Sequence, residues 1–387
     1  MNKKELELYI HIPFCVRKCS YCDFLSAPAT EQTREAYMAA LFAEIGGRAK
    51  DYSDRTVTSI FIGGGTPSLL SGEQIGQLMD RIREQFAMAQ DAEITMEVNP
   101  GTASAEKLRN FYTAGINPLS IGMQSAQAEE LKNLGRIHDF EGFCQVYREA
   151  VEAGFTNINV DIMSGLPGQT LASYRDTLEK VLHLEPMPQH ISAYSLIVEE
   201  GTPFAAMAER GELPLPEEET ERAMYEETIE VLAKYGFHRY EISNYARDGY
   251  ECRHNVGYWI RRDYLGFGIG AASLIDNVRF QNEKSLRTYL AHPLESREEE
   301  QTLTVQDRME ETMFLGLRLT RGVSCVDFAE QYGRTVEEVY GEVIARNVAD
   351  GLLTVTERKE NQKKDRFLAL TKRGLDLSNY VMAQFLF

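Results

Sequence analysis

The sequence lacks several features that mark large classes of protein. It has no run of roughly 18 apolar residues, so no membrane-spanning helix is expected. Residues 1–5 lead into a short strand-like run and do not resemble a secretory signal. Basic residues are outnumbered, with 41 Lys and Arg against 59 Asp and Glu, whereas a protein that neutralises nucleic-acid phosphates needs an excess of positive charge. We therefore expect a cytoplasmic protein with no nucleic-acid partner.

The composition is that of a folded globular chain. Hydrophobic residues make up 43% and charged residues 26% of the sequence, which excludes a wholly disordered or fibrous protein. The 387 residues suffice for two or three domains, or for one large α/β barrel with an appendage.

The first 200 residues alternate between strand-like and helix-like segments. The expected strands are residues 6–11, 57–62, 93–98, 116–121, 157–163 and 190–196, and the expected helices are residues 31–48, 73–86, 105–114, 140–153 and 173–183. Strands that alternate with helices predict βα units and a parallel sheet. The fold class is therefore α/β, a partial (β/α)6 barrel, with its chemistry at the carboxyl ends of the strands.

The remainder of the chain changes in style twice. Residues 199–216 are rich in Pro and Gly and predict a crossover, followed by a helix at 217–235 and irregular structure over 240–275. From residue 301, expected helices at 305–319, 325–332 and 336–346 precede a hairpin (352–355 and 367–370) and a last helix, which is typical of a winged helix. We predict a barrel over 1–200, a crossover and barrel extension over 201–300, and a C-terminal helical, winged-helix-like domain over 301–387. The acidic chain favours partner contact over DNA binding for this domain.

Three of the six cysteines lie close together, directly after the first expected strand. Cys15, Cys19 and Cys22 have the spacing C-x3-C-x2-C, and such a cluster in a reducing compartment more often binds metal than forms disulfides. Three thiolates on an iron centre leave one coordination position open for a chelating molecule. The alternative is a zinc site completed by His11 or Asp23, although structural zinc usually uses two ligand pairs far apart.

Polar or glycine residues follow the ends of successive expected strands, as in a barrel active site. They are Gly63, Gly64, Gly65, Thr66, Glu97, Gln124, Arg136 and Asp161. Three glycines let a ligand approach the backbone, and exposed N–H groups there bind a carboxylate. A tight turn would account for the same glycines, and a lone glutamate is more often structural.

A further string, H-N-x-x-Y-W, runs from His254 to Trp259, and Trp259 is the only tryptophan of the chain. A histidine near aromatic side chains can ligate haem iron while the rings stack on a porphyrin. From these residues alone, a core histidine beside a packed Tyr258–Trp259 pair is the simpler interpretation.

The cysteine motif after a barrel's first strand resembles the radical S-adenosylmethionine (SAM) superfamily, and residues 9–15 resemble oxygen-independent coproporphyrinogen III oxidases. The resemblance implies a [4Fe-4S] cluster on Cys15, Cys19 and Cys22, with SAM on the fourth iron. It also implies SAM contacts from Tyr9, Tyr21, Gly64, Gly65, Thr66, Glu97, Gln124, Arg136 and Asp161. The last three are candidates for a second SAM.

Two features resemble the haem-chaperone branch of this family, HemW. Phe24 stands where the oxidases have a further cysteine, and the H-N-x-x-Y-W string is followed by G-F-G-I-G-A at 266–271. The branch implies haem as cargo, held by His254, Tyr258 and Trp259 and delivered to haem-dependent respiratory proteins. A homodimer and a peripheral membrane contact through recipients are further expectations. The alternatives are a radical SAM enzyme that decarboxylates a porphyrinogen and a zinc-stabilised interaction module.

Overall fold

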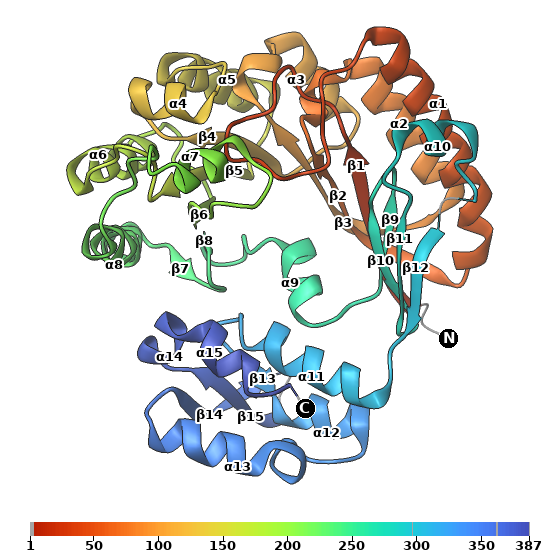
Figure 1. Ribbon diagram of the computed structural model, residues 1–387. Helices are drawn as coiled ribbons and strands as arrows, with labels where there is room; N and C mark the ends of the chain where they lie inside the picture. Colours follow the sequence, from red (N-terminus) through yellow and green to blue (C-terminus); the bar gives the residue numbers. More distant parts are fainter. Residues whose placement is uncertain (1–3, 296, 361–362, 387) are drawn as a thin grey trace.

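The computed structural model describes residues 4–295, 297–360 and 363–386. Its main feature is one large sheet in the strand order β12-β11-β10-β9-β1-β2-β3-β4-β5-β6-β8-β7. The six central strands are parallel, and they are β1 (Lys4–Ile12), β2 (Arg55–Gly64), β3 (Ala87–Val98), β4 (Leu119–Gln124), β5 (Ile158–Ser164) and β6 (His190–Ser195). The sheet curls without its two edge strands meeting, so the predicted partial barrel is confirmed (Figure 1).

Helices cover the outer face of the parallel strands (Figure 1). They are α1 (Glu31–Arg48), α2 (Gly72–Gln85), α3 (Ala105–Thr113), α4 (Ala128–Leu134), α5 (Phe140–Ala153) and α6 (Leu171–Leu182). The start of α2 is fixed by a capping box between Ser71 and Gln74, which satisfies N–H groups that have no partner inside the helix. Ile75, Leu78 and Ile82 then recur at helical spacing and bury one face. The predicted helices of this region are confirmed, and α4 was not predicted.

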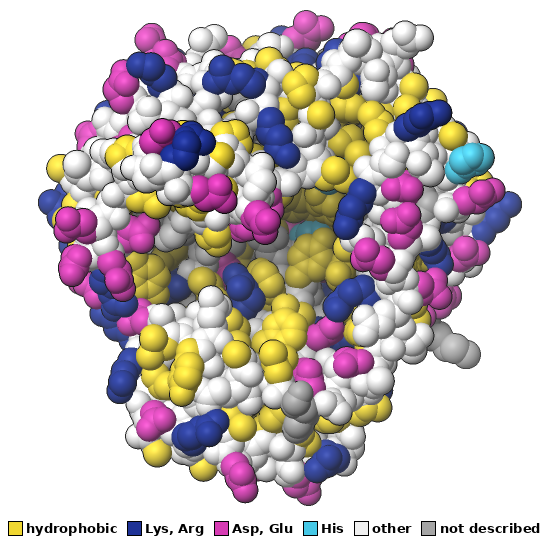
Figure 2. All heavy atoms as spheres, in the orientation of Figure 1, with side chains coloured by type: hydrophobic (Ala, Val, Ile, Leu, Met, Phe, Trp, Pro, Cys, Tyr) yellow, Lys and Arg dark blue, Asp and Glu magenta, His cyan; other side chains and the backbone are white. Residues whose placement is uncertain are grey.

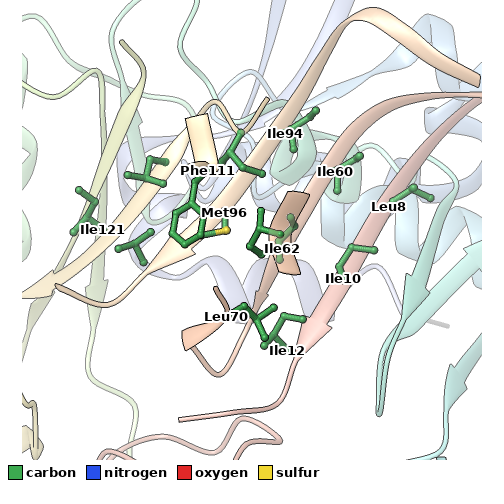
Figure 3. Packing of buried hydrophobic residues seen from close by; sticks show 14 of the residues in the cluster. Leu8, Ile10, Ile12, Ile60, Ile62, Leu70, Ile94, Met96, Phe111 and Ile121 are labelled. Atoms are coloured by element: carbon green, nitrogen blue, oxygen red, sulfur yellow. The ribbon is translucent and has the colours of Figure 1, made fainter. Parts of the chain in front are cut away.

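The core lies between the sheet and these helices. Alternate residues of β1, including Leu8, Ile10 and Ile12, are fully buried and pack beside Ile60 and Ile62 of β2 (Figure 3). Because successive strand residues point to opposite faces, the residues between them point into the barrel. The inward residues of the first three strands are largely polar or aromatic, and they are Glu7, Tyr9, His11, Ser59, Phe61, Glu93, Thr95 and Glu97.

The sheet continues beyond the six predicted strands at both edges. On one side β9 (Tyr264–Phe267) pairs in parallel with β1 and is followed by β10 (Ala272–Ile275), β11 (Val278–Asn282) and β12 (Arg297–Thr302). On the other side β7 (His238–Arg239) and β8 (Asn244–Ala246) follow β6. The prediction of irregular structure over 240–275 was therefore wrong, because these short strands are stabilised by partners distant in sequence.

The described middle of the chain adds the helices α7 (Pro203–Glu209), α8 (Glu218–Lys234), α9 (Arg253–Trp259) and α10 (Leu286–Ala291). Helix α9 carries the H-N-x-x-Y-W string and lies between the barrel and the C-terminal part (Figure 1).

The C-terminal part has the helix and strand order of a winged helix, as predicted. Its elements are α11 (Val305–Gly316), β13 (Val323–Ser324), α12 (Cys325–Tyr332), α13 (Val336–Ala349), β14 (Leu353–Glu360), β15 (Lys363–Leu370), α14 (Lys372–Asp376) and α15 (Ser378–Ala383). A hydrophobic cluster separate from that of the barrel fills this part. The exact domain boundaries stay predictions. Among the described residues, no helix combines the length and apolarity needed to cross a bilayer.

Candidate functional site

The three clustered cysteines and most of the predicted SAM contacts line one cavity at the carboxyl ends of the strands. Eight of the nine predicted residues share it with Cys15, Cys19 and Cys22, namely Tyr21, Gly64, Gly65, Thr66, Glu97, Gln124, Arg136 and Asp161. The ninth, Tyr9, lines a neighbouring cavity together with Gly64 and Glu97. Residues spread over 150 positions of the sequence are thus gathered at the barrel mouth, as parallel strands require.

The cysteine loop is attached to the barrel by backbone bonds at several points. The Cys15 N–H donates to the Ala27 carbonyl at 3.2 Å, and the Ser20 N–H donates to the Leu134 carbonyl at 3.0 Å. Two side chains face the sulfur atoms: the Thr66 hydroxyl lies 3.5 Å from Cys15 Sγ, and Arg136 Nη1 lies 3.9 Å from Cys19 Sγ. Both groups are hydrogen-bond donors, so they can donate to the sulfur ligands of a metal centre.

The cavity offers three thiols as its soft donors, a set that suits an iron–sulfur cluster. Among the described residues, no group of three or more His, Cys, Asp or Glu side chains converges on one metal position. A tetrahedral zinc site needs a fourth ligand beside three thiols, and His11 and Asp23 are the candidates. His11 is also engaged at both ring nitrogens, by the Leu25 carbonyl at 2.8 Å and the Tyr9 hydroxyl at 3.0 Å, and Asp23 is exposed.

The glycines after β2 are required by close backbone approaches. Gly64 has φ 110°, a left-handed conformation that favours glycine, and its N–H donates to Glu97 Oε2 at 3.1 Å. A Cβ on Gly65 would lie 2.7 Å from the Phe14 carbonyl oxygen and 2.9 Å from the Ile12 carbonyl oxygen. The turn therefore lies directly against the start of the cysteine loop.

Two carboxyl groups face this cavity in a low-dielectric environment. Burial, assisted by Asp161, raises the pKa of Glu97 to about 8. Burial also raises the pKa of Asp161, which accepts a hydrogen bond from Asn159 Nδ2 at 2.7 Å. A cationic ligand beside these groups would favour their ionised forms. Asp161 was predicted at the end of its strand, and this placement was wrong because β5 continues to Ser164.

Arg136 occupies the same cavity with part of its guanidinium engaged. Its Nη2 donates to the Gly122 carbonyl at 2.6 Å, which fixes the side chain across the strand ends. Its Nε is buried and has no hydrogen-bond partner among the described residues. A buried donor without a partner is costly in a folded protein and indicates that a ligand accepts from it.

The His254 side chain is enclosed in the barrel interior, with only 1% of its surface exposed. One ring nitrogen lies 2.9 Å from the Ser59 hydroxyl and the other lies 3.1 Å from the Tyr258 hydroxyl. Burial lowers the pKa of His254 to about 3 and raises the pKa of Glu7, whose carboxylate lies 3.9 Å away, to about 8. At neutral pH both groups are uncharged, so they do not form an ion pair.

The three predicted haem contacts do not share one pocket. Tyr258 lines the cavity that holds Tyr9, whereas Trp259 lines a cleft against the C-terminal domain. The Arg318 guanidinium lies 4.3 Å from the Trp259 ring centroid. A third cavity, inside the barrel, includes Cys252 and Asn255 beside Glu97, Gln124 and Asp161. The helix α9 therefore contributes side chains to three separate spaces.

Sequence reasoning missed the residues that hold α9 in the barrel. The Glu93 carboxylate accepts hydrogen bonds from the backbone N–H groups of Arg253 at 3.0 Å and His254 at 3.1 Å. Ser59 and Phe61 contact the His254 ring from β2. Strand alternation places these side chains in the barrel, but nothing in the sequence pairs them with a helix 160 residues later.

Comparison with known proteins finds family models that match the barrel and the C-terminal part of the chain. A family model of the radical SAM superfamily matches residues 9–181, and a model of the HemN C-terminal domain matches residues 303–377. A protein of Bacillus subtilis named heme chaperone HemW is 38% identical over 385 residues, with 98% of each chain covered. The chain belongs to the HemW family.

Other relatives agree with this membership. A HemW of Escherichia coli is 37% identical over 358 residues, covering 90% of this chain and 92% of that protein. Among solved structures, the coproporphyrinogen III oxidase HemN of Escherichia coli, described as a radical SAM enzyme, matches with a TM-score of 0.84 and 27% identity. The structural match covers 100% of this chain and 91% of the HemN chain. The predicted membership of the HemW branch is confirmed.

Proposed function

We propose that this protein is a haem chaperone that binds haem and passes it to haem-dependent respiratory proteins. The observation that carries the proposal is the similarity to HemW chaperones along almost the whole chain, including the helix α9 that bears the H-N-x-x-Y-W string. Phe24, which is 57% exposed at the barrel mouth, replaces the further cysteine expected of the oxidases.

A [4Fe-4S] cluster and SAM complete the proposed functional protein. Cys15, Cys19 and Cys22 would hold the cluster, and the eight residues of their shared cavity would hold SAM. When bound, a cluster of this kind supplies a one-electron donor next to the sulfonium. The chain itself supplies the buried carboxyl of Glu97, the guanidinium of Arg136 and the glycine turn at Gly64 and Gly65, which lines the same cavity.

His254 is the proposed haem ligand, with Tyr258 and Trp259 beside the macrocycle. In the described arrangement both ring nitrogens are engaged and the ring is buried, so ligation requires α9 to move away from the barrel. Figure 2 shows a hollow between the barrel and the C-terminal domain, with hydrophobic side chains on its walls. A planar, largely apolar molecule suits walls of this kind.

The remaining proposals concern where and with what the protein acts. Three reduced thiols suit the cytoplasm, where glutathione and thioredoxin keep cysteines reduced. Respiratory haem proteins are the proposed recipients, which would bring the chain to the membrane surface only through those partners. A homodimer stays a prediction, as does the absence of a nucleic-acid partner.

An optical titration with haem tests the central proposal. Wild-type protein should show a shifted Soret band that saturates with haem, and His254→Ala should lose it because the iron loses its imidazole ligand. His292→Ala, which removes an exposed histidine, is the matched control and should bind as the wild type does. An unchanged affinity in His254→Ala would contradict the assignment of this ligand.

The second candidate function is oxidative decarboxylation of a porphyrinogen. The observation that favours it is the close structural match to HemN. Anaerobic incubation with coproporphyrinogen III, SAM and a reductant separates the two candidates. We expect no protoporphyrinogen IX, and its formation would show that the chain is an enzyme of the HemN type.

A further inference from the structure

Helix α9 is held between two bodies that do not otherwise form one core. On the barrel side, Glu93 accepts from the first two N–H groups of the helix, and Ser59 bonds to His254. On the other side lies α11 of the C-terminal domain, and Figure 1 shows α9 in the space between the two. Any outward movement of His254 must therefore displace α9 from the C-terminal domain as well.

The attachment to the C-terminal domain is made by the residues that immediately follow the string. Arg261 Nε donates to Glu311 Oε2 at 2.8 Å, and the two side chains are 3% and 7% exposed. Arg279 Nη1 of β11 donates to the other oxygen of the same carboxylate at 2.7 Å. Glu311 thus joins the end of α9, the sheet extension and α11, and the low dielectric around it makes the loss of one partner costly.

The backbone at this attachment is strained. Arg261 has φ 57°, a left-handed conformation that a residue with a long side chain rarely adopts. Such conformations persist where surrounding contacts enforce them, and they are concentrated at switches and binding sites. The buried ion pair with Glu311 holds the Arg261 side chain, with a longer contact to Asn277 Oδ1 at 3.5 Å, so loss of Glu311 removes the charged partner of the residue that follows α9.

The neighbouring contact carries unsatisfied donors. Arg318 lies over the Trp259 ring, yet Arg318 Nε and Trp259 Nε1 are both buried and have no hydrogen-bond partner among the described residues. Buried donors without partners weaken the closed arrangement relative to one in which water or a ligand reaches them. The contact between α9 and the C-terminal domain therefore combines one well-formed ion pair with buried donors that have no partner among the described residues. Such a contact can be released.

We propose that the C-terminal domain controls access to His254 by clamping α9 through Glu311 and Arg318, so that release of this clamp exposes the imidazole for haem. The proposal deepens the proposed function, since the imidazole is the ligand assigned there. It gives the C-terminal domain a role in this chain: α11 holds the haem-motif helix in the closed position until it is displaced.

Chemical modification of histidines by diethyl pyrocarbonate, followed by mass spectrometry, tests the clamp on the full chain without haem. Glu311→Gln should raise the modification rate of His254 by about tenfold or more, because local opening governs the reactivity of a buried group. Glu342→Gln, a charge removal at an exposed site of α13, is the matched control and should leave the rate unchanged. His138, whose ring bonds the Met123 carbonyl of β4 at 3.3 Å, is the internal reference and should keep its wild-type rate in every variant.

A second variant guards against misfolding of the first. Arg318→Met removes the cation above Trp259 at a partly exposed position and should also accelerate modification of His254, by a smaller factor. Equal rates for His254 in the wild type and both variants would overturn the clamp. Joint acceleration of His254 and His138 would also overturn it, since that result reports general unfolding.

Haem binding is then measured on the same samples. Glu311→Gln should associate with haem faster than the wild type. A variant that combines Glu311→Gln with His254→Ala should not show this faster association. A wild-type chain that binds no haem would refute the proposed function, while the modification rates of His254 would still decide whether the clamp exists. The two proposals therefore fail through different measurements.

Discussion

The His254 ring stacks on the Phe61 ring, with centroids 5.4 Å apart and planes inclined at 27°. The contact joins the haem-motif helix to β2, whose carboxyl end carries the glycine turn of the proposed SAM site. Phe61 is stacked in turn on Tyr9, with centroids 6.5 Å apart. A row of three rings therefore connects α9 with the two central strands of the barrel.

Replacing Phe61 tests how much this row stabilises the closed helix. Phe61→Leu should lower the free energy of unfolding by about 1 kcal/mol, since it loses aromatic contact but keeps most of the volume. Urea titration followed by circular dichroism measures the change. Tyr380→Leu, at a side chain that is 60% exposed, should alter stability by no more than about 0.5 kcal/mol. Equal stabilities of Phe61→Leu and wild type would show that the stack contributes nothing.

Removing one proposed cluster ligand should abolish the cluster without unfolding the chain. Cys22→Ser loses a thiolate that the iron requires, so anaerobic reconstitution should give little bound iron and sulfide and no visible charge-transfer absorption. Cys144→Ser, on the outer helix α5, is the matched control and should bind iron as the wild type does. A wild-type chain that takes up zinc and no iron would refute the cluster.

Gly65 offers a sharp test of the SAM cavity. Gly65→Ala forces a Cβ to within 2.7 Å of the Phe14 carbonyl oxygen, and a rigid backbone cannot withdraw as a side chain would. Affinity for SAM, measured by equilibrium dialysis with the reconstituted protein, should fall by about tenfold or more, as expected for a loss of at least about 1.4 kcal/mol.

Gly76 provides the control for this glycine. It lies on α2 with nothing within 4 Å of an added Cβ, so Gly76→Ala should keep the SAM affinity. Its stability should rise by about 0.5–1 kcal/mol, since alanine has the higher helix propensity. Equal SAM affinities of the two alanine variants would remove the glycine turn from the binding site.

Glu7 should make the protein less stable as the pH rises. Burial raises its pKa from 4.5 to about 8, so between these values the folded chain retains a proton that the unfolded chain releases. The contribution of Glu7 to the free energy of unfolding is therefore fully present below about pH 4.5 and decreases progressively as the pH approaches 8. Above about pH 8 it changes no further. Glu7→Gln mimics the protonated acid and should remove this slope.

The measurement is the free energy of unfolding in urea at pH 5 and pH 8. Relative to wild type, Glu7→Gln should gain at least about 1 kcal/mol between the two pH values. Glu106→Gln, an exposed glutamate of α3, is the control and should keep the wild-type slope. A Glu7→Gln variant with the wild-type slope would show that Glu7 is ionised in the folded protein.

The sequence predicts the parallel half of this fold well because its signals are local. Apolar runs such as Leu6–His11 and capped helices such as α2 carry their own periodicity, and the cysteine spacing marks the loop between them. The SAM contacts were predicted from the resemblance to the radical SAM superfamily, and eight of the nine share one cavity because parallel strands bring their carboxyl ends together.

The rest depends on contacts between distant segments. The strand β9 is four residues long and is stabilised by pairing with β1, and the strand β12 has the wholly exposed sequence R-E-E-E-Q-T. Neither has a hydrophobic period for sequence reasoning to detect. In the same way, the H-N-x-x-Y-W string is visible in the sequence, but the burial of His254 arises from Ser59 and Phe61 on β2 and Glu93 on β3.

Gly257 lies at the point where α9 comes nearest to β1. A Cβ there would lie 1.9 Å from Glu7 Oε1, so even the smallest side chain would collide with the barrel wall. The absence of a side chain at this position lets α9 pack closely against the Glu7 carboxyl of β1. In a homologous chain, a bulkier residue at this position would hold the helix farther from β1. The imidazole of such a chain would then stay accessible to an iron porphyrin.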